Sequence, residues 1–567
     1  MRRTAKIHAL LLALSLTAAR ELAAQPASTA PAPAEGERPL PPPPPPSDEV
    51  AGTGFEPRFV LDTGRIPFRQ PDPQRVGYDA HGELQLRLTV LSDLPLAPVP
   101  GVPGTSTLGQ EFRAEYWLRA TPRVTFGEKL AVIGQIDLRG FFAGEETRFV
   151  GAAARPYDDR DAADIDPRWL YLEYRTPTLL ASIGLQGQYW GLGLFENDGD
   201  HPTLFGDYAG GRRAALVLLG ARPGGEASPF NVFLAGGVAY PDADQEFQPF
   251  GDDLKQGLAA LEGVVSAYYA DRSDNFLGFY GVYRHWSRDA ELLPGRVFDE
   301  TLDEFVLDSA GRFDSRIPGS AGFVFGEYEV AYKIGTSKFV RTPDVPSTEE
   351  SADVRALGAA TRLGAVATAG KGDDRWGRVV AQVEWGWASG DANPTDGTLR
   401  RFTFDPNYNV GLVLFDQVLA FKTARAAVIA QDTGVVQRPN PGIDQLASNG
   451  AVFGATYVYP TLVLRPVPEL DLKAALLVAQ ATADFVDPVV ATVSGRYQSY
   501  DGGSARNRDL GLELDGGVEY RLALARALTL QLGAQGGVFF PGNAFDDAAG
   551  GRLPTQYLAM LRLGLQY

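Results

Sequence analysis

Cysteine is missing from this chain of 567 residues, and histidine and methionine are scarce, with four and two residues. The absence of cysteine excludes disulfide bonds, thiolate metal sites and lipid attachment through a cysteine side chain. The formal charge of -18 leaves no basic excess, which argues against non-specific binding to nucleic acid. Beyond the N-terminal leader there is no run of about eighteen apolar residues, so membrane-spanning helices are not expected.

Recognisable catalytic and metal-binding motifs are also missing. The sequence has neither an HExxH pair nor a GxSxG elbow, and only His81, His201 and His285 follow the leader. The acidic segments around Tyr157 to Asp166 and around Asp198 lack a complete calcium loop and are expected to be solvated external loops. We therefore expect no catalytic residues, no metal and no cofactor; an outer-membrane hydrolase using His201 or His285, or a structural anchor, remains an alternative.

The N-terminal segment has the layout of an export signal. Three basic residues within the first six precede an apolar run, and Ala23 and Ala24 form a small-residue cleavage site. The next segment is rich in proline and includes the run from Pro41 to Pro46, which favours an extended spacer. The predicted organisation is a cleaved signal peptide over 1–24, a Pro-rich periplasmic linker over 25–78 and a β-barrel over 79–567.

The body of the chain shows long stretches with a period of two. In GELQLRLTV, Leu84, Leu86, Leu88 and Val90 alternate with polar residues, and the segment NRDLGLELDGGVEYRL repeats the pattern. These segments exceed the usual five or six residues of a globular strand and approach the roughly 9 to 11 that a tilted strand needs to cross a bilayer.

The connections between these segments alternate between tight turns and long polar loops, which is typical of outer-membrane barrels. About eighteen strands can be placed, and an even number brings both chain ends to the periplasmic side. The predicted fold class is all-β, a transmembrane antiparallel up-and-down barrel in the outer membrane of a Gram-negative bacterium. Its expected partners are outer-membrane lipid, lipopolysaccharide and the barrel-assembly machinery, with no nucleic acid.

Several segments resemble a known family. RWLYLEYRTPTLLASIGLQGQYWGLGLFEND, GEYEVAYKIG, DVRALGAATRLG and VAQVEWGWASGDANPTDGTLRRFTFDPNYNVG are similar to the alginate-export type of outer-membrane protein. The resemblance implies an eighteen-stranded channel that passes a polar solute, such as an exported polysaccharide of the alginate kind, with loops folding over or into the pore.

If the apolar faces contact lipid, the polar faces line the lumen. Acids and bases are about equally represented there, which departs from the basic lining expected for a polyuronate, and wall charges that pair with one another are an alternative to a selective constriction. The predicted pore-lining residues are Arg87, Arg113, Glu115, Arg119, Asp137, Arg139, Glu173, Arg175, Gln186, Glu327, Glu329, Arg378, Glu384, Asp509, Glu513 and Arg521.

Residues 390–449 are too long for an ordinary connection and contain the apolar stretch VGLVLFDQVLAFKTARAAVIA. An inward plug or gate, a helical cap on the outer rim and a miscounted strand pair are all open. We favour a short helix buried against the lumen or the rim.

Aromatic residues mark the expected membrane boundaries. Trp190, Trp286, Trp385 and Trp387 are predicted to form an outer aromatic girdle, with Trp376 at the inner end. The segment QYLAMLRLGLQY is predicted to be the closing strand. Its outward side chains are expected to form an assembly signal, namely Tyr557, Leu561, Leu563, Leu565 and Tyr567.

Overall fold

The computed structural model describes residues 76–96, 112–144, 148–149, 152–153, 164–201, 203–206, 211–240, 259–270, 275–293, 296–318, 322–339, 350–369, 376–431, 447–525 and 528–567. The predicted signal peptide and nearly all of the predicted linker lie outside these residues. The same holds for 432–446 of the predicted long loop and for most of the acidic segment around Asp158.

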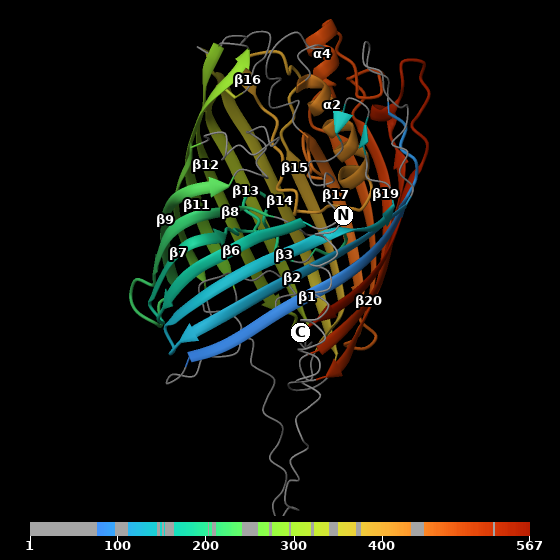
Figure 1. The fold of residues 1–567 in the computed structure, drawn as a ribbon. Helices are drawn as coiled ribbons and strands as arrows, with labels where there is room; N and C mark the ends of the chain where they lie inside the picture. The colour runs from blue at the N-terminus through green and yellow to red at the C-terminus, as the bar shows by residue number, and fades with distance from the viewer. Residues whose placement is uncertain are drawn as a thin grey trace, which may run out of the picture. The chain divides into compact units, whose positions relative to one another are not determined.

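Antiparallel strands form one closed barrel (Figure 1). The main sheet has nineteen strands, of which the two-residue β16 is an addition at one end of β14, so that eighteen strands make the wall. The wall strands are β1 (Val76–Leu91), β2 (Phe112–Phe126), β3 (Leu130–Gly144), β6 (Asp164–Arg175), β7 (Leu179–Gly187), β8 (Arg213–Ala221), β9 (Phe230–Tyr240), β10 (Ala259–Ala270), β11 (Phe276–Leu293), β12 (Arg296–Arg316), β13 (Phe323–Ser337), β14 (Ala352–Ala369), β15 (Trp376–Ala388), β17 (Ala455–Leu464), β18 (Leu470–Ala481), β19 (Asp509–Ala525), β20 (Leu528–Pro541) and β21 (Gln556–Gln566).

The first and last strands close the barrel by pairing with each other. β1 and β21 are antiparallel over nine residue pairs, from Glu83 opposite Gln566 to Leu91 opposite Leu558. The seam continues for one more residue, because Gly82 and Tyr567 exchange both backbone hydrogen bonds at 3.0 Å. The ring of Tyr567 lies over Gly82, where a Cβ atom would clash with it. The predicted fold class is confirmed.

The alternation of polar and apolar residues along each strand determines which side chains face lipid. Along β1, Gln85, Arg87 and Thr89 are buried while Leu88 and Val90 are exposed, and the same alternation recurs around the wall. Outward residues such as Leu363, at 63% exposure, would be unfavourable in water but suit hydrocarbon. A closed barrel with this apolar outer surface is an outer-membrane barrel, because closure satisfies the backbone polar groups in lipid.

The β11–β12 connection departs from the predicted pattern. The predicted alternation of tight turns and long loops would place a long external loop there, whereas the two strands continue to Leu293 and Arg296. The other external connections that we expected to be long remain long, and β1 begins at Val76, slightly before the predicted start of the barrel.

Helical segments occur in the long external connections. The connection between β15 and β17 contains β16 (Thr398–Leu399), the π-helix η3 (Leu414–Leu419) and α2 (Ala420–Gln431). The β18–β19 connection contains α4 (Pro488–Ser494), and η5 (Asn543–Phe545) follows β20; two-residue strands β4 (Arg148–Phe149) and β5 (Ala152–Ala153) pair after β3. In the described part of the chain, no helix is long and apolar enough to cross a membrane.

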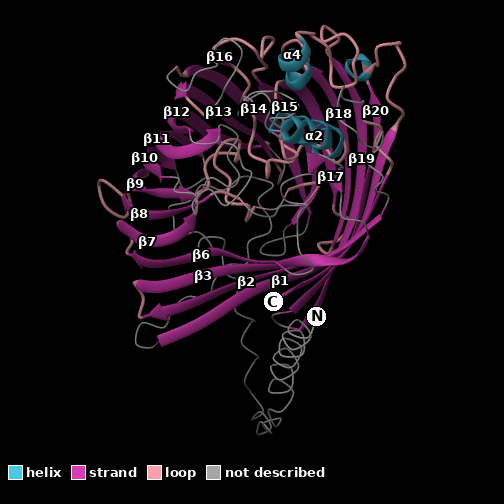
Figure 2. Cartoon of the chain, turned by 45° about the horizontal axis from the view of Figure 1, so that its top comes forward, coloured by secondary structure: helices cyan, strands magenta, loops and turns pink. Residues whose placement is uncertain are grey.

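The inside of the barrel is occupied by chain rather than left as an open cylinder. Figure 2 shows α2 and loop segments within the ring of strands. Buried aromatic and aliphatic side chains from the β7–β8 and β15–β17 connections form one hydrophobic cluster with inward residues of the wall, among them Phe195, Phe404, Phe415 and Leu477. These two connections therefore supply apolar side chains to the interior of the barrel.

Candidate functional site

The described residues of the connection between β7 and β8 (188–201, 203–206 and 211–212) turn into the lumen, and the connection is called the first inward loop below. Its Trp190 indole donates to Asp308 of β12 at 3.1 Å. The backbone N–H groups of Leu192 and Leu194 both donate to the carboxylate of Glu329 on β13, the latter at 3.1 Å. Gly191 and Gly193 have φ values of 61° and 84°, which favour glycine and let the backbone reach that carboxylate. One buried wall glutamate thus holds the loop at residues 192–194.

A second attachment of the first inward loop is an ion-pair cluster. Glu196 lies between Arg284 of β11, at 3.2 Å, and Arg212 at the end of the loop, at 3.1 Å. Arg284 also faces Glu262 at 3.5 Å and Glu304 at 3.4 Å. Arg284 is fully buried, so three surrounding carboxylates compensate for the removal of its charge from water.

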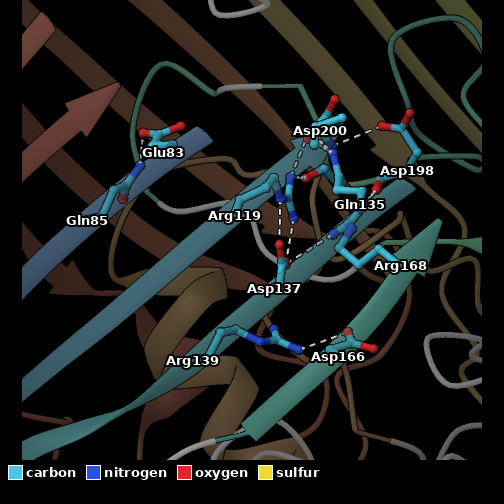
Figure 3. Close-up of polar contacts among 12 residues, drawn as sticks. Glu83, Gln85, Arg119, Gln135, Asp137, Arg139, Asp166, Arg168, Asp198 and Asp200 are labelled. Atoms are coloured by element: carbon cyan, nitrogen blue, oxygen red, sulfur yellow. Dashed lines mark hydrogen bonds and ion pairs between the residues drawn. The ribbon is translucent and has the colours of Figure 1, made fainter. Parts of the chain in front are cut away.

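The opposite wall holds the following segment of the same loop (Figure 3). Arg119 of β2 makes a bidentate pair with Asp137 of β3, with both distances at 2.8 Å, and also donates to the Gly199 carbonyl at 2.8 Å. Its third partner is the Asp200 carboxylate at 2.9 Å, and Arg168 of β6 donates to the carbonyl of Asp198. The first inward loop is therefore tied to both sides of the barrel.

This arrangement corrects the prediction that the segment around Asp198 is a solvated external loop. Asp198 is 4% exposed and lies inside the barrel beside Arg168 and His201. The apolar residues around it, including Leu194 and Phe195, are removed from water by the wall.

The β15–β17 connection, residues 389–454, is the second inward loop, and it uses the same kind of attachment. The backbone N–H groups of Leu412, Val413 and Leu414 donate to the carboxylate of Glu513 on β19, at 2.5, 2.8 and 2.7 Å. Glu513 is fully buried, and three charge-assisted hydrogen bonds satisfy it. The favoured prediction of a short buried helix in this loop agrees with η3 and α2, whose residues from Leu414 to Ala426 are almost entirely buried.

The two inward loops meet in the middle of the barrel. The N–H of Asp405 in the second loop donates to the carbonyl of Leu194 in the first at 2.7 Å. Close by, the phenol of Tyr408 donates to Glu384 of β15 at 2.8 Å and accepts from Arg362 of β14 at 3.0 Å. Burial raises the pKa of the Tyr408 phenol well above its usual value, so this hydroxyl stays protonated at neutral pH.

A small polar cavity remains where the loops and the wall converge, with a volume of about 60 Å³. It is called the junction cavity below. The first loop contributes Tyr189, Leu192, Asn197, His201, Thr203 and Leu204; the second contributes Asn407, Tyr408 and Asn409; the wall contributes Arg362, Gln382, Glu384 and Tyr459.

Buried charges are segregated around the wall. Among the described residues, the buried charges on β1, β2, β3 and β6 are mostly basic: Arg87, Arg113, Arg119, Arg139 and Arg168 against Glu115, Asp137 and Glu173. From β10 to β19 the buried charges are mostly acidic: Glu262, Glu300, Glu304, Asp308, Glu327, Glu329, Glu384, Asp471, Glu513 and Asp515 against Arg284, Arg312 and Lys333. Acids and bases are nearly balanced in the sequence, but in the barrel they are separated into a mostly basic part of the wall and a mostly acidic part.

Most of the predicted pore-lining residues are buried on inward faces, and many are paired. The buried ones are Arg87, Arg113, Glu115, Arg119, Asp137, Arg139, Glu173, Gln186, Glu327, Glu329, Glu384 and Glu513. Arg175 and Arg521 are partly exposed and pair with Glu173 and Asp471.

Two predicted pore-lining residues lie elsewhere. Arg378 and Asp509 are exposed, and both lie at bulges where strand pairing shifts by one residue. A bulge breaks the strict alternation on which the prediction rests.

The predicted aromatic girdle is partly wrong. Trp190 lies in the first inward loop, and Trp286 is fully buried on the inward face of β11 beneath Arg284. Trp385 does face outward at 44% exposure. His285 also lies on the outer side of β11, where its Nδ1 is 2.7 Å from Asp303.

Sequence reasoning missed much of the site. Glu262, Arg284, Asp308, Arg362 and Gln382 were not among the predicted residues, although Gln382 precedes Glu384 by two positions and so shares its face. That alternation was the available signal. Among the described residues, no group of three or more histidine or acidic side chains is arranged to hold a metal ion.

Comparisons with known proteins give no family. No family model matches the chain, and no curated protein matches it. Solved structures that resemble it include the outer membrane protein OprD from Pseudomonas aeruginosa, with a TM-score of 0.44, 10% identity, and coverage of 88% of this chain and 97% of that one. OccAB1 from Acinetobacter baumannii has a TM-score of 0.46 at 10% identity, covering 86% and 96%. OccK2 (OpdF) from Pseudomonas aeruginosa, in complex with glucuronate, has a TM-score of 0.43 at 11% identity, and the match covers 88% of this chain and 97% of that one.

These findings correct the resemblance drawn from sequence. The solved structures named above are OprD and Occ proteins and not alginate-export proteins, and the resemblance to the alginate-export family drawn from sequence is contradicted. The quoted segments contain the strand alternation that outer-membrane barrels share.

Proposed function

We propose that this protein is a passive outer-membrane channel for small polar solutes, in which the two inward loops narrow the lumen. The observation that carries this proposal is the shared attachment: a buried wall glutamate, Glu329 or Glu513, accepts two or three backbone N–H groups from each loop. Loops held in this way restrict passage at a fixed position.

The charges of the wall favour polar cargo. A solute crossing the lumen passes between a mostly basic wall and a mostly acidic wall, and both present hydrogen-bonding side chains. Such groups replace part of the solute's hydration, which lowers the barrier for polar molecules over apolar ones. The contact between the loops, from Asp405 to Leu194, argues for a small size limit.

The apolar side chains on the outer surface of the barrel indicate what the protein contacts in the membrane. We propose that the exposed apolar wall contacts outer-membrane lipid and lipopolysaccharide. We propose that β21 is the strand read by the barrel-assembly machinery, since Tyr557, Leu561, Leu563 and Tyr567 are exposed along the seam and Leu565 is partly exposed.

Liposome swelling tests the proposal. Purified protein is reconstituted, and swelling rates are measured in neutral solutes of increasing size, from glycerol to a disaccharide and larger oligosaccharides. We expect permeation that falls steeply with size. Swelling no faster than in protein-free liposomes for every solute, with the barrel shown to be folded by heat-modifiable migration, would contradict the channel function.

A further inference from the structure

We propose that the junction cavity is a binding site for a small neutral polyol, in the size range from glycerol to a hexose, on its way through the channel. This inference rests on the proposed channel function and specifies its substrate class. The junction cavity is lined by a side-chain amide whose oxygen accepts no hydrogen bond from the described residues. Gln382 of β15 is 5% exposed, lines the cavity, and its carbonyl oxygen has no hydrogen-bond partner among the described residues.

A buried amide oxygen without a partner is unusual, because buried polar groups are nearly always hydrogen-bonded. The partner of the Gln382 carbonyl oxygen must be a hydrogen-bond donor. A hydroxyl group can donate this hydrogen bond and can also accept one from another group. The amides of Asn407 and Asn409 line the same cavity. Amide side chains offer donors and acceptors without net charge, which suits a solute carrying several hydroxyl groups.

Charge around the cavity favours a neutral solute. The wall charges that line it are Arg362 and Glu384, and they bind each other with Nε and Oε2 2.6 Å apart. Arg362 also lies 4.0 Å from Glu327, and His201, which also lines the cavity, has Nε2 3.6 Å from the Asp198 carboxylate. A charged solute would have to leave water and compete with pairs that are already formed.

Aromatic rings supply a surface for a carbon skeleton. The rings of Tyr189 and His201 stack with centroids 3.5 Å apart, and Tyr408 and Tyr459 line other parts of the cavity. A polyol has hydroxyl groups for the amides and C–H faces for the rings. The volume of about 60 Å³ holds one end of such a molecule.

Solute block of ion current tests the site. Single-channel current is measured in planar bilayers with increasing D-glucose, and gluconate serves as a charged probe of similar size. We expect glucose to reduce the current in a saturable way and gluconate to act at least about threefold more weakly.

The Gln382→Leu variant keeps the size of the side chain and removes the amide. We expect it to weaken glucose block about three- to tenfold, since a single neutral hydrogen bond contributes about 0.5–1.5 kcal/mol. Gln535→Leu, on the inward face of β20 where Gln535 contacts Met560, is the matched control and should leave block unchanged.

The outcomes separate the two proposals. A folded protein that conducts no ions would contradict the channel function. A conducting protein that gluconate blocks as strongly as glucose, or in which Gln382→Leu leaves block unchanged, would overturn the polyol site alone. If Gln382→Leu does not fold, calorimetric titration of the detergent-solubilised wild type with glucose and gluconate decides the question, and equal or absent binding of the two overturns the site.

Discussion

Replacing Glu513 by alanine should release the tip of the second inward loop. Its carboxylate accepts three backbone N–H groups, from Leu412, Val413 and Leu414, in a fully buried position. Hydrogen bonds to a charged group contribute about 1.5–3 kcal/mol each, and a buried donor left without a partner costs about 1–3 kcal/mol. Because the three bonds share one acceptor and water can enter a loosened loop, we expect a loss of about 3–6 kcal/mol.

The assay for this prediction is amide hydrogen exchange at residues 412–414, combined with single-channel conductance. A loss of about 3–6 kcal/mol corresponds to an increase of about two to four orders of magnitude in local opening, and exchange should accelerate by the same factor. Conductance should rise and become noisier. Glu513→Gln keeps one carbonyl acceptor and should have an intermediate effect.

Glu519→Ala is the matched control on the same strand. Glu519 pairs with Lys473 at 3.2 Å and Arg521 at 2.7 Å, and its loss should leave exchange at 412–414 unchanged. If Glu513→Ala folds normally and these amides exchange as in the wild type, the attachment assigned to Glu513 is wrong.

Three further predictions concern the other loop, the seam and an external helix. Glu329→Ala should raise hydrogen exchange at Leu192 and Leu194 by at least about tenfold and raise conductance, with no change at residues 412–414. Gly82→Leu should clash with the Tyr567 ring, and we expect a lower temperature of barrel unfolding on heat-modifiable gels, which Tyr567→Ala partly restores. Burial raises the pKa of the Asp487 N-cap to about 7, so its contribution to stability is full below the unfolded pKa near 4 and is lost as the pH rises to about 7. Exchange within α4, corrected for intrinsic rates, should therefore increase from pH 5 to pH 8, and Asp487→Asn should flatten this dependence; an unchanged slope would refute the assignment.

The wall of the barrel was predictable from sequence because one rule governs it. The structure has the eighteen wall strands expected from the sequence, since lipid on one side and a polar interior on the other impose an alternating pattern along each strand. The errors on the wall have local causes. Bulges displaced Arg378 and Asp509, and Trp286 was assigned to the outside although it shares an inward face with Arg284.

The loops were less predictable because their partners are distant in the chain. Leu194 and Glu329 are separated by 135 residues, and no local pattern links a loop N–H to a particular wall carboxylate. The apolar residues of the first inward loop lack a strand or helix period, so nothing in that segment indicated burial. The second loop was recognised because its apolar stretch is long. The hydrogen-bond acceptor that holds it, Glu513, could not be inferred.

The most direct test of the account is the conductance of a protein without the second inward loop. Residues 400–446 are replaced by a short glycine-serine linker, and single-channel conductance is compared with that of the full-length protein in the same bilayer and salt. The account predicts a folded barrel with a clearly larger conductance and a higher size limit for neutral solutes. A folded barrel with unchanged conductance would show that the loop does not narrow the pathway.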